Sequence, residues 1–151
     1  MTDGGPAAAK GPTPPKSAAL ADANIFVALF AGPEHSHHEE ALGLFRRVAF
    51  GELDLIVTST VLAEIVYVAR TFLGWSRQEA SRRLAGLIEA EGLVVQEKEV
   101  HEEALALFGA TGGLDFVDAY LVAYARRLGP PAVASFDRDF DGIDGLVRIA
   151  S

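Results

Sequence analysis

The 151-residue sequence contains no cysteine, few basic residues and no long apolar run. Without cysteine the chain can form neither a disulfide nor a thiolate metal site, and this composition suits a reducing compartment such as the cytoplasm. No apolar run approaches the roughly 18 residues that cross a bilayer, and the N-terminal segment lacks the apolar stretch of a secretory signal. We therefore expect a soluble, cytoplasmic protein that does not act at a membrane.

Basic residues are outnumbered by acidic ones. The chain has 13 Lys and Arg against 21 Asp and Glu, which gives a net charge of -8 and a pI near 4.9. This balance argues against simple electrostatic adsorption to nucleic acid, which normally requires a basic surface. An acidic protein can still act on phosphates if bound cations reverse the local charge. The placement of the carboxylates therefore becomes the central question.

The chain divides into a short tail and one folded domain. Residues 1–17 are rich in Pro, Gly and Ala and show no apolar periodicity, which predicts a flexible tail. Residues 18–151 form the predicted domain, and a hydrophobic content of 50% is ample for a single core.

Short apolar runs alternate with amphipathic segments, which is typical of a parallel sheet covered by helices. We expect strands at about 18–22, 54–58, 92–96, 131–135 and 146–149, and helices at about 24–30, 37–50, 60–73, 77–91, 98–109 and 115–128. The capping boxes Ser36-x-x-Glu39 and Ser76-x-x-Glu79, together with Ser59, mark three helix starts. The predicted fold class is α/β: a three-layer α/β/α sandwich with a central, mostly parallel sheet of four or five strands.

Three carboxylates stand alone in apolar segments. Asp22, Glu64 and Asp118 are each the only charge in runs of 16, 15 and 10 residues, and no Lys or Arg lies in those runs. We expect each of them to be at least partly buried. An ionised carboxylate in a protein interior costs several kcal/mol unless it is protonated, paired with a cation or bound to a metal. A helix cap or a distant arginine would explain any one of them, but the three together favour a site.

The predicted elements place four acids where they can meet. Asp22 and Asp137 each follow a predicted strand, Glu64 lies in the second turn of a helix that follows one, and Asp118 lies in the first turn of a helix that precedes one. In an open parallel sheet the ligand crevice lies beyond the carboxyl ends of the strands, so all four could converge on one edge. Like charges packed so closely stay ionised together only beside a divalent cation. Oxygen ligands without cysteine favour Mg²⁺ or Mn²⁺, ions typical of phosphodiester chemistry.

Other motifs admit metal interpretations that we weigh less. The D-x-D-x-D-G segment that begins at Asp137 matches half of a calcium loop, but its twelfth position is Arg148 instead of a bidentate Glu. In EHSHHEE, His37 and His38 are adjacent and point to different sides of a helix, so a solvated first turn is the favoured interpretation. Asp115 is either a helix cap or an outer metal ligand, and we favour the cap.

The ordered segments LADANIF, VLAEIVYV, LDFVDAYLVAYA and SFDRDF resemble those of a PIN domain, specifically of the VapC-like toxins of prokaryotic toxin-antitoxin pairs. The resemblance covers about residues 18–150. It implies a metal-dependent endoribonuclease in which Mg²⁺-activated water attacks an RNA phosphodiester in line. It also implies a homodimer that is held inactive by a small antitoxin, which places a peptide across the active groove.

By position, the resemblance assigns catalytic and metal-binding roles to a set of acids, and supporting roles to two small polar residues. The catalytic and metal-binding acids are Asp22, Glu64, Asp118 and Asp137, a further metal ligand is Asp139, and the supporting residues are Asn24 and Ser135. A housekeeping PIN nuclease that works without an antitoxin is one alternative. A PIN-like binding module without chemistry is another, and the presence of all four catalytic acids argues against it.

Overall fold

The computed structural model of the chain describes residues 16–150, in which every predicted helix and strand is present with shifted ends. In chain order the elements are β1 (Ser17–Leu20), α2 (Ala23–Ala31), α3 (His38–Ala49), β2 (Leu53–Val57), α4 (Ser59–Thr71), α5 (Arg77–Ile88), β3 (Leu93–Val95), α6 (Lys98–Ala110), α7 (Phe116–Ala125), β4 (Ala132–Ala134), the 3-10 helix η1 (Arg138–Gly142) and β5 (Val147–Ile149). No helix among these residues combines the length and apolar character needed to cross a membrane.

The predicted N-terminal tail lies outside the described residues except at its end. Ser17, which the sequence assigns to the tail, is the first residue of β1 and pairs with Leu53 of β2. Its amide donates to the carbonyl of Glu52 at 3.3 Å. The first strand therefore begins one residue before the predicted domain boundary.

One of the three predicted helix caps is confirmed and one is shifted. Ser76 caps α5, because its hydroxyl accepts a hydrogen bond from the amide of Glu79 at 3.0 Å. In α4 the capping side chain is Thr58, which accepts from the amide of Val61 at 3.3 Å, so the predicted Ser59 cap is wrong by one residue. The hydroxyl of Ser59 instead serves a contact between helices that is described below.

The predicted capping box at Ser36 is wrong. The residue that caps α3 is His37, and its side chain makes no capping hydrogen bond. The amide of His37 donates to Nδ1 of His35 at 3.1 Å, so a local turn replaces the box. Helix α3 consequently begins at His38, one residue later than expected.

The main sheet is parallel, with strand order β1-β2-β3. Both crossovers step along the sheet in the same direction, and right-handed connections then put their helices on one face. On that face lie the alternate side chains of β2, namely Leu53, Leu55 and Val57, all of which are buried. They pack with residues of α2, α4, α5 and α6 in the main core.

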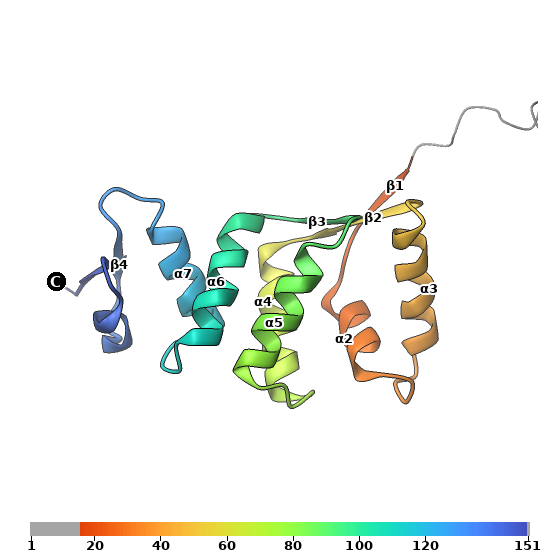
Figure 1. The fold of residues 1–151 in the computed structure, drawn as a ribbon, viewed down its shortest axis with the longest axis horizontal. Helices are drawn as coiled ribbons and strands as arrows, with labels where there is room; N and C mark the ends of the chain where they lie inside the picture. The colour runs from red at the N-terminus through yellow and green to blue at the C-terminus, as the bar shows by residue number, and fades with distance from the viewer. Residues whose placement is uncertain (1–15, 151) are drawn as a thin grey trace, which may run out of the picture.

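The last two strands form a parallel pair of their own, β4-β5, instead of joining the main sheet. With α7 and η1 they make up what we call the C-terminal unit, residues 114–150. It has a small core of its own, formed by Leu114, Val122, Ala125, Val133 and Phe140. In Figure 1 the C-terminal unit lies at one end of the molecule, and α6, α5 and α4 separate it from α2 and α3.

The predicted α/β class with parallel strands is therefore confirmed, but its strands are divided differently. The sequence predicts one sheet of four or five strands between two helical layers, whereas one chain forms a sheet of three strands and a sheet of two. The physical reason is that α7 packs along α6 and leads β4 away from the edge of β1. Among residues 16–150 no helix lies on the second face of the main sheet, where Leu20 and Val94 are exposed.

Candidate functional site

The start of α7 holds two of the predicted acids. Asp115 is its N-cap, and the Oδ1 atom of Asp115 accepts a hydrogen bond from the amide of Asp118 at 2.9 Å. The predicted cap is thus confirmed, while a role for Asp115 as an outer metal ligand stays a prediction. Asp118 is partly buried, as expected, and burial raises the pKa of its carboxyl group. The nearby carboxylates of Asp115 and then Asp137 raise this pKa further.

The segment after β4 folds back toward the start of α7 through a series of side-chain caps. Ser135 accepts a hydrogen bond from the amide of Asp137 at 3.0 Å, and Oδ1 of Asp137 accepts one from the amide of Asp139 at 2.9 Å. These bonds bend the chain into η1. A Cβ built on Gly113 would lie 3.9 Å from Cγ of Asp139, so this acid faces the loop between α6 and α7. Asp115, Asp118, Asp137 and Asp139 thereby occupy one end of the C-terminal unit.

The second half of the acidic stretch is held by an arginine. Nε of Arg148 lies 2.6 Å from Oδ1 of Asp141, and its Nη1 donates to the carbonyl of Ser135 at 3.0 Å. A calcium loop would need the Asp141 carboxylate for the ion. Its pairing with Arg148 therefore supports the sequence-based preference against a calcium site.

Asp22 and Glu64 lie elsewhere and are exposed, so the expectation that both are at least partly buried is wrong. Asp22 follows β1 and is the N-cap of α2, but its side chain makes no capping hydrogen bond. Glu64 lies on α4, whose buried positions include Leu62, Ile65 and Val66. Apolar sequence neighbours made Glu64 resemble a core residue, but the helix turns its side chain away from that core.

The four catalytic acids predicted to converge are therefore divided within one chain. Figure 1 shows α2, which follows Asp22, and α7, which carries Asp118, on opposite sides of α4, α5 and α6. Over residues 16–150, no three carboxylate, imidazole or thiol groups gather closely enough to hold a metal ion. Over the described residues, a single chain therefore brings only part of the predicted metal-binding set together.

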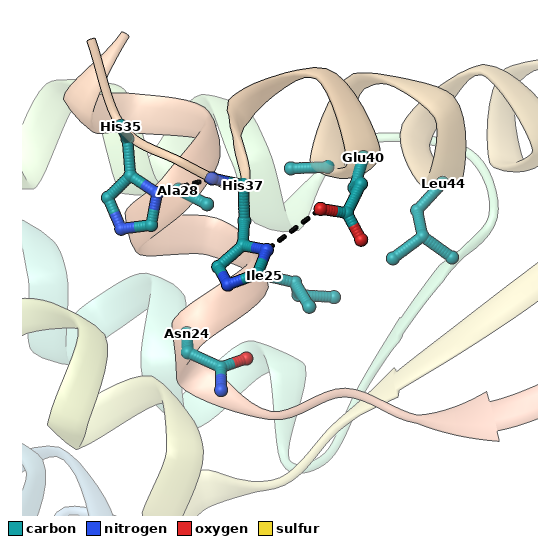
Figure 2. Close-up of a pocket in the computed structure, with 8 residues that line it drawn as sticks. Asn24, Ile25, Ala28, His35, His37, Glu40 and Leu44 are labelled. Carbon is teal, nitrogen blue, oxygen red and sulfur yellow. Dashed lines mark hydrogen bonds and ion pairs between the residues drawn. The ribbon is translucent and has the colours of Figure 1, made fainter. Parts of the chain in front are cut away.

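Asn24, a predicted supporting residue, lines a different pocket between α2 and α3. Figure 2 shows it facing the pocket, with His35, His37 and Glu40 on the opposite wall. Nδ1 of His37 lies 2.8 Å from Oε1 of Glu40, and both side chains are well exposed. This agrees with a solvated first turn for His37. His38 differs, because it is buried and its Nδ1 lies 2.8 Å from the carbonyl of Ala28.

A polar network between α4, α6 and α7 was not predicted from the sequence. The hydroxyl of Ser59 donates to Oε1 of Glu97 at 2.6 Å and lies 2.8 Å from Nε2 of His101. The Tyr120 hydroxyl donates to the same Glu97 oxygen at 2.8 Å. His101 is fully buried, and burial lowers the pKa of its imidazole more than Glu97 raises it. The available signal was the position of His101 on the apolar face of α6, beside Val100, Ala104 and Leu105.

Comparison with known proteins assigns the chain to a family. A search of curated protein sequences finds no match. A family model described as the PIN domain matches residues 19–146, which is most of the chain. Proteins of this family are generally nucleases, that is, hydrolases acting on nucleic acid. On this match, and with the parallel α/β fold in agreement, the chain belongs to the PIN domain family.

Proposed function

We propose that the chain is an endoribonuclease that hydrolyses phosphodiester bonds in RNA and requires Mg²⁺, with Mn²⁺ as a substitute. The family match supports nuclease chemistry, and PIN nucleases typically use divalent metals. The observation that carries the proposal is at Asp118, where burial first, and then the carboxylates of Asp115 and Asp137, raise the pKa of its carboxyl group. A bound divalent cation would relieve such repulsion.

The proposed site residues are those assigned from the sequence. Asp22, Glu64, Asp118 and Asp137 are the proposed catalytic acids, Asp139 is a further proposed metal ligand, and Asn24 and Ser135 are proposed to support them. None of the ion pairs found over residues 16–150 involves any of these five acids. Their carboxylates are therefore not neutralised by a described Lys or Arg, which supports a role toward a cation.

The proposed biological role is that of a VapC-like toxin, a homodimer in the cytoplasm that a cognate antitoxin keeps inactive. The family match supports the nuclease part of this role, and the order of the four motifs supports the toxin branch. A housekeeping nuclease that matures RNA without an antitoxin is the alternative. A short reading frame upstream that overlaps this one would favour the toxin.

The test is an RNA cleavage assay with Mg²⁺, with Mn²⁺ and with a chelator. Asp118→Asn and Asp22→Asn should each lower Mg²⁺-dependent cleavage by about 100-fold or more, because each removes a carboxylate from the proposed site. Asp144→Asn is the matched control, since Asp144 is an exposed acid of the same C-terminal stretch outside the proposed set.

Two further measurements make the outcome decisive. Circular dichroism should show the same helical content in all variants, so that a loss of cleavage reports on the site. Calorimetric titration with Mn²⁺ should show binding to the parent chain and weaker binding to Asp118→Asn. If both Asn variants cleave RNA as fast as the parent, the proposal is wrong.

A further inference from the structure

Strand β1 has one edge without a partner strand. It pairs with β2 on one side, and over residues 16–150 no strand pairs with its other side. The amides of Ser17 and Ala21 donate toward β2, to the carbonyl of Glu52 just before that strand at 3.3 Å and to the carbonyl of Ile56 at 2.9 Å. Because backbone groups alternate in direction along a strand, those of Ala18 and Leu20 point to the open edge. Such an edge is a template for pairing with another strand.

The face of the main sheet that no helix covers presents an apolar row. Leu20 is the register partner of Ile56, and Ile56 is the register partner of Val94. The three side chains therefore lie side by side across β1, β2 and β3, opposite the buried face of the sheet. Leu20 is 72% exposed and Val94 is 50% exposed. The open edge and the open face adjoin at Leu20.

The C-terminal unit presents the complementary features. Ser135 donates its amide to Ile149 of β5 at 3.0 Å, so the backbone groups of Ala132 and Ala134 point to the open edge of β4. Beside that edge, α7 and the turn after it carry an exposed apolar stripe at helical spacing: Val117, Leu121, Tyr124 and Leu128, which are 41–53% exposed. An apolar groove runs between this stripe and β4.

We propose that β4 of a second copy of this chain pairs in parallel with the open edge of β1, while the α7 stripe of that copy covers the Leu20, Ile56 and Val94 row. In the same way, β4 of the first copy pairs with β1 of the second, which gives a closed dimer with two-fold symmetry. Each half of the dimer then contains a parallel sheet of five strands between two helical layers. This is the architecture that the sequence predicts and that one chain does not complete.

The occupant is a second copy because the chain's own α7 is held away from β1. Arg77 donates to the carbonyls of Phe108 at 3.1 Å and Gly112 at 3.2 Å, and also to the carbonyl of Leu114, which fixes the loop before α7. The ring of His101 stacks on those of Phe116 and Tyr120, with centroids 6.0 Å and 5.1 Å apart. Figure 1 accordingly shows β1 and β4 far apart along the molecule.

Parallel pairing also brings the divided acids together, and in this respect the inference rests on the proposed function. The carboxyl end of β1 leads to Asp22, and the carboxyl end of β4 leads to Asp137. Parallel strands place these ends at the same edge. The start of α7, with Asp118, lies at that end as well, because Asp139 of η1 faces Gly113 in the loop that leads into α7. Each site of the dimer would thus combine Asp22 of one copy with Asp118 and Asp137 of the other.

Complementation between inactive chains tests the shared site. Asp22→Asn and Asp118→Asn chains are unfolded together, mixed in equal amounts and refolded. Half of the dimers are then mixed, and each mixed dimer holds one intact site, so cleavage should recover to about one quarter of the parent value. If the parent chain cleaves RNA but the refolded mixture of variants recovers no cleavage, the two copies do not share a site. A parent chain that dimerises but does not cleave would instead count against the proposed function alone.

Cross-linking tests the surface independently of activity. Because the chain has no cysteine, the double variant Ala18→Cys/Ala132→Cys carries only the two introduced thiols. Mild oxidation should give a disulfide-linked dimer on a non-reducing gel. A disulfide within one chain would mean that the C-terminal unit closes on its own sheet, and a reduced monomer would mean that the edges do not meet. Either result overturns the proposal.

An interface variant gives the matching measurement in solution. Leu121→Asp places a charge on the α7 stripe, where the side chain is exposed in the single chain and should therefore tolerate the change. Sedimentation should show a dimer dissociation constant at least about tenfold above that of the parent. Phe50→Asp, at an exposed apolar residue outside the proposed contact, should leave it unchanged. Equal dissociation constants for all three proteins, or a monomeric parent, would contradict the proposal.

Discussion

The main body of the chain and the C-terminal unit contrast in how far each encloses its own core. In the main body, β2 has a strand on each side and three of its five side chains are buried. In the C-terminal unit, β4 contributes only Val133 as a buried residue and β5 contributes none. Strand β2 is thus enclosed by a strand at each edge and by helices on one face. The C-terminal unit lacks such neighbours and depends on α6 and, in our proposal, on a second copy.

Truncation of the largest buried side chains should separate the two regions most clearly. Phe26 is fully buried in the main core, with ring centroids 6.5 Å from Phe30 and 5.3 Å from Phe45. Phe26→Ala should lower the free energy of unfolding by about 3–5 kcal/mol, because it removes these contacts and leaves a cavity. Urea denaturation followed by the fluorescence of Trp75 measures this loss.

The matched change in the other region is Phe140→Ala, at a side chain that is also buried. We expect this change to loosen the C-terminal unit while the main sheet stays folded, because Phe140 belongs to a buried cluster separate from the main core. Hydrogen exchange should accelerate over residues 114–150 and remain slow in β2. If β2 and the C-terminal unit lose protection equally, the chain unfolds as one body and the contrast between the two regions does not hold.

The next prediction concerns the joint between the two regions, which is the loop from the end of α6 to the start of α7. Arg77 ties the end of α6 to the start of α7 through three backbone carbonyls, and its guanidinium lies 4.3 Å from the centroid of the Phe108 ring. Arg77→Gln should lower the free energy of unfolding by about 1–3 kcal/mol, because it removes charged hydrogen bonds to partly buried acceptors. The control is Arg82→Gln, because Arg82 is an exposed residue of α5, the helix that also carries Arg77.

The joint also bears on the dimer. With Arg77 replaced, the C-terminal unit gains freedom to reach the sheet of its own chain. The monomer fraction of Arg77→Gln should therefore be higher than that of the parent. A variant as stable as the parent would show that the carbonyls are solvated equally well without the guanidinium, and that Arg77 does not fix the joint.

The sequence predicted the local elements well because their signals are local. The apolar run of β2 and the capping box at Ser76 each depend on residues within a few positions. The burial of Asp22 and Glu64 was predicted incorrectly, because apolar neighbours along the chain do not specify which face of a helix a side chain occupies. The pairing of β4 depends on how α7 packs on α6, a long-range contact that the pattern of β4 does not encode.

The same distinction applies to the candidate site. The cap at Asp115 and the bend at Asp137 follow from side-chain hydrogen bonds over two or three residues, and the cap was predicted. The network of Ser59, Glu97 and His101 joins residues about forty positions apart, so no local pattern could predict it. What can be predicted from sequence here is which acids are candidates, and not whether one chain gathers them.

A pH dependence should distinguish the network from the exposed histidines. Burial lowers the pKa of His101 below its ordinary value of 6.5, so the unfolded chain binds a proton there more readily than the folded one. The stabilisation is therefore present above about pH 6.5 and is lost as the pH falls from there through the lowered pKa of the folded state. Hydrogen bonds from Ser59 and Tyr120 lower the pKa of the Glu97 carboxyl group from its ordinary value of 4.5.

His101→Gln should make the unfolding free energy depend less on pH over that window, although it lowers stability at neutral pH. His37→Gln, at an exposed histidine outside the network, is the comparison variant. Chemical denaturation at several pH values measures both slopes. A slope that is the same in His101→Gln and the parent would show that another group controls the pH dependence.

The smallest effect is expected at the acidic stretch itself, in the pair of Arg148 with Asp141. The Asp141 side chain is 47% exposed, so water screens its ion pair with Arg148 and the pair adds little to the stability of the fold. Arg148→Gln should therefore lower the melting temperature only slightly, in contrast to Phe26→Ala. The variant also frees the Asp141 carboxylate for a calcium ion. Because the twelfth loop position would then be a Gln, which lacks the bidentate carboxylate, millimolar calcium should stabilise neither protein, and a calcium-dependent rise in the variant alone would show that Arg148 blocks a cation site.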